Sequence, residues 1–388
     1  MIRMKNTFFG LFIPLFVGLF VGCSGTEQAP PSTDWVIKRL DNYNTPAPRM
    51  GQRPDAVTKA SVKIPAELRI VSWNVENLFD TENDPDNLGD DEFTPTGTQK
   101  WTVAAYEKKL VQLAQLIAEM KPDIIGLAEI ENRRVLKDLQ RTLLVNHAYD
   151  LPEILHRESP DKRGIDVALL AKYKPTDTQW LRANDDAREM LSASFTIGPA
   201  SLTVVMCHWK SKRVAPGMTE EASEAMRVKE ATTLRTYVKD RLRDNPNAAL
   251  LVMGDFNDFV TSPILCQTAG LLLNRDALTA DPTALFNLSS ALPENERGTY
   301  YYHPQKKWND LDSISVSPRL LGQGTSSLWT LRPQSYHIVR TPKQLNSDGT
   351  PKGFRLFKPK DKPEGFYITT GYSDHFPVTL TLERVGAH

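Results

Sequence analysis

Two periodicities of apolar and polar residues alternate along the chain from Leu68 onward. Short apolar runs of strand length recur at Leu68–Trp73, Ile124–Leu127, Val167–Leu170, Leu202–Cys207, Ala248–Met253, Asp310–Ser315 and Val378–Leu382. Between them, apolar residues recur every three or four positions, as on one face of a helix, at Tyr106, Leu110, Leu113, Ile117 and Met120 and again at Ala231, Leu234, Val238 and Leu242. Strands that alternate with amphipathic helices predict one α/β domain with a mixed sheet core over residues 67–388.

The first 66 residues follow a different pattern. Arg3 and Lys5 precede an apolar run of 14 residues, Phe8–Val21, which is shorter than the roughly 20 residues that a spanning helix needs. A positive start and a short apolar run are typical of a secretory signal peptide, predicted here over residues 1–22. Residues 24–66 lack apolar periodicity and contain six prolines, so residues 23–66 are predicted to form a semi-stiff tether.

The segment LFVGC at residues 19–23 resembles a bacterial lipobox, with Phe20 where leucine is usual. The resemblance implies cleavage before Cys23 and lipidation of its thiol, and Ser24 favours sorting to the outer membrane. We therefore expect a lipid-anchored protein of a bacterial cell envelope, with the anchor as its only contact with the membrane. The alternative is an ordinary cleaved signal that leaves a free cysteine.

Composition excludes several classes of protein. The 388 residues include 47 Lys and Arg against 47 Asp and Glu, 40% hydrophobic and 24% charged residues. These values exclude a wholly disordered chain, a collagen-like fibre and a multi-span membrane protein. A net charge of zero argues against coating nucleic acid by bulk charge but permits an enzyme with a local basic groove. Three cysteines are too few for a disulfide framework, and Cys207 and Cys266 are predicted to be free thiols rather than a pair.

Polar side chains recur where the predicted strands end. They are Asn74 and Glu76, Glu129, His208, Asp255 and Asn257, Asp312, and Asp374 and His375. Carboxylates, amides and imidazoles at the mouths of strands build a poor core but a good metal site above a rigid scaffold. The oxygen donors among them suit a hard cation such as Mg²⁺, with Mn²⁺ or Ca²⁺ as alternatives. Zinc is disfavoured because no Cys-x2-Cys spacing occurs.

Six segments in order resemble motifs of the endonuclease/exonuclease/phosphatase superfamily, which has the deoxyribonuclease-I-like fold. They are SWNVENLFD (72–80), GLAEIEN (126–132), RGIDVALL (163–170), CHWKSK (207–212), GDFN (254–257) and GYSDHFP (371–377). The resemblance spans roughly residues 67–385. It implies a four-layer α/β/β/α sandwich, in which two mixed sheets pack face to face with helices outside.

The same resemblance implies a role for each matching residue. Glu129 is similar to the principal metal ligand, with Asn74, Glu76 and Asp374 as its helpers. His375 is similar to the catalytic histidine beside the attacking water, and Asp312 to the carboxylate that orients it.

Four further residues are similar to groups that handle the phosphate. Asp255 and Asn257 correspond to groups that hold the water and a phosphate oxygen, and His208 to a second histidine that donates toward a phosphate oxygen or the leaving group. Arg163 and Lys210 are predicted to bind the phosphate as cations. The family often has histidine after the aspartate at Asp312, where this chain has Ser313.

Three hypotheses about function follow. The first is an exported Mg²⁺-dependent phosphodiesterase, a nuclease (endonuclease) that acts on DNA, RNA or oligonucleotides. It is favoured by a basic stretch, His337–Pro363, with seven Lys and Arg against two Asp. The second is the same chemistry on sphingomyelin or on a small inositol, sugar or nucleotide phosphoester. The third is a non-catalytic surface binding module, and no protein partner is implied by any of them.

Overall fold

Two β-sheets lie face to face in the computed structural model, which describes residues 64–385 apart from 86, 88, 215–216, 324–327 and 358–367. The predicted signal peptide, Cys23 and all but the last three residues of the predicted tether lie outside this range. The described residues belong to one unit, Val62–His388.

The first sheet combines parallel and antiparallel strands. Its order is β14 (Trp329–Leu331), β18 (Val378–Arg384), β1 (Glu67–Leu78), β2 (Ile124–Ile130), β4 (Asp166–Ala171) and β3 (Glu153–His156), with β15 (His337–Ile338) also on β18. Strand β1 pairs in parallel with β2 and antiparallel with β18. The carboxyl ends of β1 and β2 therefore meet at the edge where β18 begins.

The second sheet is also mixed. Its order is β5 (Asp177–Leu181), β6 (Met190–Ile197), β7 (Ala200–His208), β8 (Ala249–Asp255), β13 (Asp312–Val316), β10 (Leu285–Asn287) and β9 (Leu271–Leu272). Strands β7 and β8 are parallel, and β13 runs antiparallel to β8. As in the first sheet, the carboxyl ends of two parallel strands, β7 and β8, lie beside the start of an antiparallel strand, β13.

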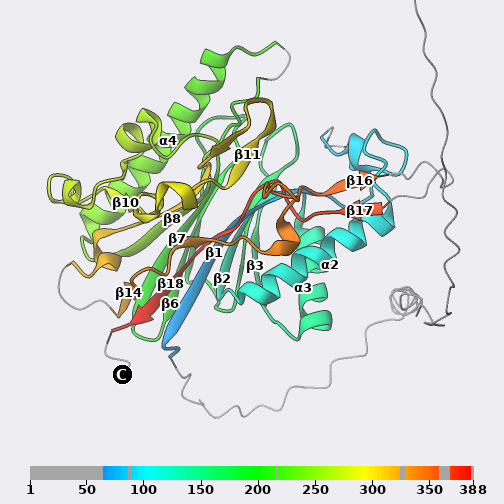
Figure 1. Ribbon diagram of the computed structural model, residues 1–388. Coiled ribbons are helices and arrows are strands. Elements are labelled where there is room, and N and C mark those ends of the chain that lie inside the picture. The colour runs from blue at the N-terminus through cyan, green and yellow to red at the C-terminus, as the bar shows by residue number, and fades with distance from the viewer. Residues whose placement is uncertain are drawn as a thin grey trace, which may run out of the picture. The chain divides into compact units, whose positions relative to one another are not determined.

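Three long helices cover the outer faces of the two sheets (Figure 1). Helices α2 (Val103–Met120) and α3 (Arg133–His147) share an apolar cluster with the first sheet, and α4 (Glu220–Asp244) shares another with the second. A third cluster, with Leu68, Val204 and Ile314 among its members, fills the space between the sheets. The predicted four-layer α/β/β/α sandwich is thus confirmed.

Smaller elements complete the described chain. Two hairpins are formed by β11 (Tyr300–Tyr302) with β12 (Lys307–Asn309), and by β16 (Arg355–Phe357) with β17 (Ile368–Thr370). Short 3-10 helices span Asp91–Phe93, Arg275–Thr279, Leu288–Ala291, Glu294–Glu296, His303–Gln305, Pro318–Leu321 and Pro342–Gln344, and a π-helical turn spans Ile264–Thr268.

Each long helix begins at a side-chain cap. The oxygens of Thr102, Asn132 and Thr219 accept hydrogen bonds from the backbone N–H three residues later, which satisfies a donor that the first turn leaves free. The predicted apolar faces of α2 and α4 are buried, from Tyr106 to Met120 and from Ala231 to Leu242. In the part of the chain that is described, no helix has the length and apolar character needed to cross a bilayer.

Several strands are longer than the apolar pattern predicts. Strand β1 continues through Asn74 and Glu76, β2 through Glu129, β7 through His208 and β8 through Asp255. The prediction that these residues follow the strands is wrong, because backbone pairing continues regardless of side-chain polarity. Their side chains are therefore held by the sheets themselves. Cys207 and Cys266 are both free thiols, as predicted.

Candidate active site

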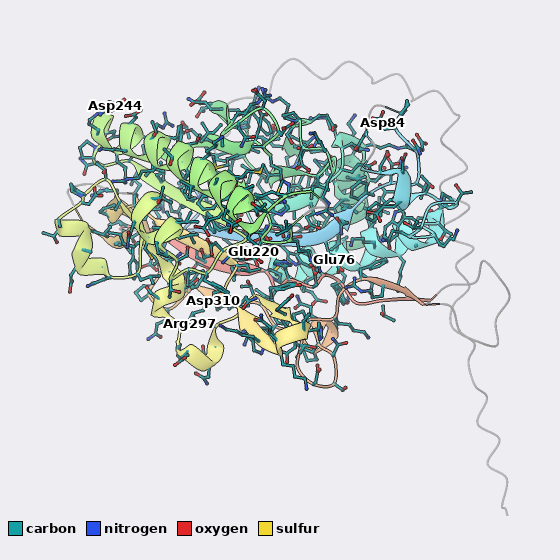
Figure 2. All side chains as sticks on the ribbon, turned by 90° about the horizontal axis from the view of Figure 1, so that it is seen from above. Glu76, Asp84, Glu220, Asp244, Arg297 and Asp310 are labelled. Carbon is teal, nitrogen blue, oxygen red and sulfur yellow. The ribbon has the colours of Figure 1, made fainter. Side chains whose placement is uncertain are left out.

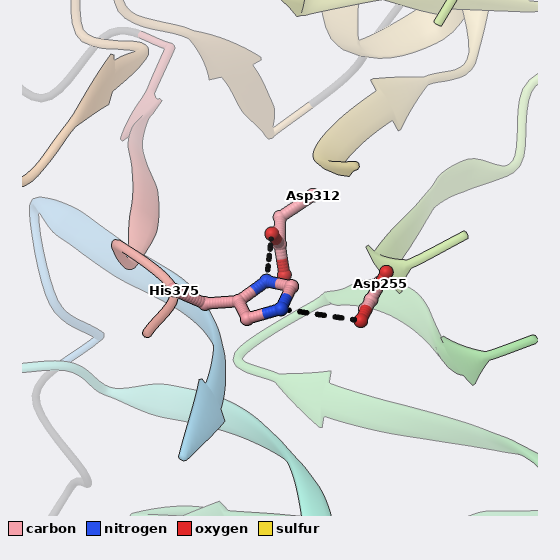
Figure 3. A group of neighbouring side chains, drawn as sticks. All are labelled: Asp255, Asp312 and His375. Atoms are coloured by element: carbon pink, nitrogen blue, oxygen red, sulfur yellow. Dashed lines mark hydrogen bonds and ion pairs between the residues drawn. The ribbon is translucent and has the colours of Figure 1, made fainter. Parts of the chain in front are cut away.

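Three site residues stand in a row across the second sheet. His208 at the end of β7 is the register partner of Asp255 on β8, and Asp255 is the partner of Asp312 at the start of β13. All three side chains are at least 97% buried. His375, from the segment before β18 of the other sheet, completes a cluster with the two aspartates (Figure 3).

His375 is oriented by a buried carboxylate. Its Nδ1 lies 2.7 Å from Asp312 Oδ2, so Nδ1–H donates to the carboxylate and Nε2 faces Asp255, 3.9 Å from Oδ2 (Figure 3). Burial alone lowers the pKa of His375, but the carboxylates of Asp312 and Asp255 outweigh burial and raise this pKa well above its usual value. Burial and the repulsion from Asp312 raise the pKa of Asp255 to about 7.

Asn74 joins the two sheets at the site. Its Nδ2 donates to Glu129 Oε1 at 3.2 Å and to Asp255 Oδ2 at 3.0 Å. The other oxygen of Glu129 accepts the backbone N–H of Asn77 at 2.8 Å. One amide therefore holds a carboxylate of the first sheet beside a carboxylate of the second.

The backbone is strained at three residues where the first sheet reaches the site and at Asn257 after β8 of the second sheet. Glu76, Asn77, Glu129 and Asn257 all have φ between 48° and 67°, a region that non-glycine residues rarely adopt. Irregular pairing accompanies the strain, because the β1–β2 register shifts between Asn74 and Leu78. Such clusters of strained residues are typical of functional sites.

Glu76 has different partners from those predicted. Its carboxylate accepts the backbone N–H groups of Phe354 at 2.6 Å and Asp374 at 3.1 Å, and it pairs with the Arg355 guanidinium. Burial and the neighbouring Asp374 raise the pKa of Glu76 to about 7. In this arrangement Glu76 ties the β16–β17 hairpin to the segment of Asp374, and its role as a metal ligand stays a prediction.

His208 is held in a cationic environment. Its Nε2 lies 3.1 Å from Arg188 Nη1, 3.8 Å from Asp255 Oδ2 and 3.9 Å from Glu129 Oε1. Burial, followed by the charges of Arg188 and Arg163, lowers the pKa of His208 well below its usual value. The imidazole is therefore neutral at pH 7, and Nε2 accepts a hydrogen bond from Arg188.

Of the two predicted phosphate-binding cations, the structure brings one to the site. Arg163 lines the cleft and donates to Asn77 Oδ1 at 2.8 Å. Lys210 instead lines a separate small hollow with Glu230, whose carboxylate accepts the Lys210 backbone N–H. The side chain of Lys212, two positions later, lines the cleft in its place.

Most of the predicted residues line one cleft of about 1010 Å³, the exceptions being Asn74, Asp312 and Lys210. Its floor includes Glu129, Asp255, Asn257, His208, Asp374 and His375. Glu76 of β1 and Glu220 at the start of α4, both labelled in Figure 2, line the cleft from the two sheets' sides. Seven cationic side chains line it too: Lys100, Lys109, Arg163, Arg188, Lys212, Arg213 and Arg355.

The acidic part of the cleft fits a divalent cation by its chemistry. Glu129, Asp374 and Asp255 offer carboxylate oxygens, the donors that hard cations prefer. Burial, together with the charge of Glu129, raises the pKa of Asp374 despite the opposing charge of His375. A cation would relieve this repulsion. Among the described residues, only Asp255, Asp312 and His375 form a triad of ligand atoms within 4.8 Å of one another, so Glu129, Glu76 and Asp374 are spaced more widely.

Sequence reasoning missed three residues of the cleft. Lys109 is 1% exposed, on the apolar face of α2, and its Nζ donates to the Glu76 backbone oxygen. A lysine three positions after Tyr106, on a face that is otherwise apolar, indicates a buried cation with a specific partner. Arg188, which reaches His208, and Tyr300, whose ring lies 4.8 Å from that of His375, carried no signal in the sequence.

Comparisons with known proteins bear on the fold and on the family. No curated protein sequence matches the chain. Among solved structures, a humanized D. rerio TDP2 is similar at a TM-score of 0.50 and 16% identity, covering 82% of this chain and 100% of that one. An endonuclease/exonuclease/phosphatase family protein from Bacteroides thetaiotaomicron has a TM-score of 0.48 (16% identity, 82% and 98% covered). A beta toxin variant from Staphylococcus aureus with bound magnesium ions has a TM-score of 0.49 (12% identity, 81% and 99% covered).

The strongest match is to a family rather than to one protein. The sequence model of the Endonuclease/Exonuclease/phosphatase family matches residues 69–384, nearly the whole of the described chain. This range contains both sheets and every residue of the cleft. The chain therefore belongs to the endonuclease/exonuclease/phosphatase family and is a metal-dependent hydrolase of phosphoester bonds.

Proposed function

We propose that this protein is a Mg²⁺-dependent nuclease, an endonuclease that cleaves the phosphodiester backbone of DNA or RNA. The observation that carries the proposal is the lining of the cleft, where seven cationic side chains surround the acidic and imidazole groups. A single phosphate monoester needs far fewer cations than this. A polyanion that extends away from the reacting bond on both sides can reach the exposed members of this set, which are Lys100, Arg163, Lys212 and Arg213.

The attacking water is positioned by Asp255 and His375. Asp255 Oδ2 and His375 Nε2 are 3.9 Å apart, so one water molecule can lie about 2.8 Å from both atoms and form a hydrogen bond with each. The raised pKa of Asp255, about 7, makes its carboxylate an effective proton acceptor near neutral pH. His375, whose raised pKa keeps it protonated, donates its Nε2–H to this water and holds it against Asp255, which takes the proton that the water loses.

The remaining side chains hold the phosphate in place. Asn257 Nδ2 donates to the Trp209 backbone oxygen at 2.9 Å, which leaves its amide at the edge of the cleft beside Asp255. Glu129, Asn74 and Asp374 would hold Mg²⁺, which when bound neutralises negative charge on the phosphate. Arg163 reaches the same cleft from the loop before β4.

A choline phospholipid is a weaker candidate substrate. Sphingomyelin presents a quaternary ammonium next to its phosphate, and the cations that line the cleft repel such a group. A small inositol, sugar or nucleotide phosphoester fits the floor of the cleft but leaves the cations at its edges without a partner. A non-catalytic binding module is disfavoured because Glu129, Asp255 and His375 converge in one cleft.

The substrate class is tested by a panel of phosphoesters. Protein loaded with Mg²⁺ is incubated with single-stranded and double-stranded DNA, RNA, sphingomyelin, inositol phosphates and phosphate monoesters. We expect chelator-sensitive cleavage of nucleic acid in the interior of the strand, lost in His375→Ala and retained in His147→Ala, whose histidine is exposed. Cleavage of another substrate but not of nucleic acid would replace the nuclease assignment.

The cellular location stays a proposal of its own. Cys23, predicted to carry a lipid that anchors the protein in the outer membrane of a bacterial envelope, lies outside the described residues. The Cys23→Ala variant should move from the membrane fraction to the soluble exported fraction while cleft activity persists. An unchanged membrane fraction would contradict the lipid anchor.

A further inference from the structure

One aromatic ring at the edge of the cleft is flanked by two lysines. Phe259 is half-buried and lines the cleft. The Nζ atom of Lys212 lies 4.2 Å from the centroid of this ring, and that of Lys307 lies 5.3 Å from it. Lys212 comes from the loop after β7 and Lys307 from β12, so two separate segments deliver their ammonium groups to one ring.

A buried carboxylate, that of Asp258, accepts a hydrogen bond from the loop that carries Phe259. Asp258 is 2% exposed, accepts the Phe259 backbone N–H at 2.8 Å and pairs with Lys212 at 2.5 Å. It also lies 3.7 Å from Arg227 Nε of α4. The carboxylate of Asp258 therefore fixes both the backbone at Phe259 and the ammonium group of Lys212.

The charge at this ring is positive overall. Asp258 faces two cations, Lys212 and Arg227, and Lys307 makes no ion pair within the described residues. Arg213 adds another cation to the lining of the cleft. Since a cation over a half-buried ring is held weakly, the ammonium group of Lys307 can leave the face of Phe259 when a better partner arrives, whereas Lys212 stays paired with Asp258.

The ring is close to the reacting groups. Phe259 follows Asn257 by two residues and Asp255 by four. Two peptide units span at most about 8 Å between the Cα atoms, so the ring lies within about one nucleotide of the phosphate that Asn257 contacts. The group that the Phe259 ring contacts is therefore the one attached next to the scissile phosphate.

We propose that Phe259, Lys212 and Lys307 form a nucleotide subsite, in which the ring stacks on the base next to the scissile bond and the two ammonium groups bind the adjoining phosphate. The inference rests on the proposed nuclease function. A nucleotide offers a planar uncharged base to the Phe259 ring and a phosphate to the lysines. The base can replace an ammonium group on the ring, because base stacking on an aromatic residue is stronger than an exposed cation–π contact. A quaternary ammonium does not, since the lysines repel it.

The test separates the base from the phosphate. Turnover is measured on a short single-stranded DNA and on the same strand with abasic sugars on both sides of the cleaved bond. We expect the wild-type protein to prefer the base-containing strand, and Phe259→Leu to lower the ratio of the two kcat/KM values about tenfold. Phe259→Trp, which keeps a stacking surface, should retain the ratio.

The contact of Lys307 with a phosphate is tested by the salt dependence of KM. Lys307→Gln should reduce the slope of log KM against log salt concentration by about 0.7, as expected for one lost phosphate contact on a single strand. The matched control is Lys239→Gln on α4, because only Lys212 and Lys307 have their ammonium groups over the Phe259 ring among the described residues. An equal slope in Lys307→Gln and the control would overturn the lysine contact.

The outcomes distinguish this inference from the proposed function. Wild-type protein that cleaves no nucleic acid would overturn the nuclease assignment and the subsite with it. Cleavage of DNA with the same base preference in Phe259→Leu as in wild type would overturn the subsite alone. Equal losses on both strands would also overturn it, because they indicate a structural role for the ring.

Discussion

The two sheets deliver their halves of the site in different ways. His208, Asp255 and Asp312 come from regular positions of the second sheet, where they are direct register partners. Glu76 and Glu129 come from the first sheet at points where the backbone adopts positive φ and the pairing is irregular. Regular pairing fixes the proton-handling groups rigidly, whereas the strained ends of β1 and β2 turn carboxylates toward the cleft.

This difference suggests a division of labour. The groups in regular register are nearly fully buried, and burial is the main cause of the shifted pKa values of His208 and Asp255. The carboxylates of the first sheet depend on contacts between segments, such as those of Asn74 with Glu129 and of Arg355 with Glu76. Substitutions in the second sheet, and at His375, which Asp312 of that sheet orients, should therefore remove chemistry, whereas those at Glu76 and Glu129 should disturb cation binding and local order.

The largest loss is expected at His375. His375→Ala removes the imidazole that Asp312 orients, and kcat should fall by roughly 10²–10⁴-fold while the protein stays folded. The measurement is turnover of the preferred phosphodiester together with a thermal melt. A rate close to that of wild type would mean that the histidine is assigned the wrong role.

A loss of at least about 100-fold is expected at Glu129, with a different signature. Glu129→Ala removes the carboxylate that Asn74 and Asn77 hold, so activity should recover in part as Mg²⁺ is raised. Titration of activity with Mg²⁺ distinguishes this from His375→Ala, which should not recover. Glu224→Ala on the exposed face of α4 is the matched control. A loss in Glu129→Ala that no Mg²⁺ concentration relieves would place Glu129 with the proton-handling groups.

A smaller loss, about tenfold or less in kcat, is expected at Glu76. Glu76→Gln weakens the tie to Arg355 and to the N–H groups of Phe354 and Asp374, so the β16–β17 hairpin should become easier to cleave with protease. Limited proteolysis and a Mg²⁺ titration are measured together. If protease sensitivity is unchanged and Mg²⁺ affinity falls strongly, Glu76 is a metal ligand, as its motif implies.

The smallest effect on turnover is expected at Glu230, where pH dependence of stability is the readout. Burial raises the pKa of Glu230 on α4 to about 7, from 4.5 in the unfolded chain. A raised carboxyl pKa adds stability below about pH 4.5, and this stability is lost as pH rises through 7. Glu230→Gln should therefore remove a decline of roughly 3 kcal/mol or less in unfolding free energy between pH 5 and pH 8. Denaturant unfolding at both values is the measurement, and an unchanged decline would contradict the raised pKa.

Much of the site could be predicted because its motifs lie at strand ends. Glu129, His208, Asp255, Asn257, Asp374 and His375 all reach the cleft, as their positions after apolar runs suggested, and Asn74 holds Glu129 from behind it. Lys210 does not, because the turn after β7 directs its backbone N–H to Glu230 and brings Lys212 to the cleft instead. Sequence spacing alone does not say which of two lysines in a turn, Lys210 or Lys212, points into the cleft.

Partners from distant segments were beyond prediction. Arg355 meets Glu76 across 279 positions of sequence, and Arg188 meets His208 from the start of a neighbouring strand. The strained backbone at Asn77 and Glu129 also has no local signature, since neither is glycine. Each of these features depends on how the two sheets and the hairpins pack.

The sequence by itself determined the elements, the family and the chemical types at the site, because apolar periodicity and short motifs are local properties of the chain. Only the tertiary structure decided which carboxylate faces which imidazole, which lysine enters the cleft and where Phe259 lies beside its two ammonium groups. The physical reason is that protonation, strain and cation–π contact depend on distances of a few ångströms between segments far apart in sequence, and these distances are set by the packing of one sheet on the other.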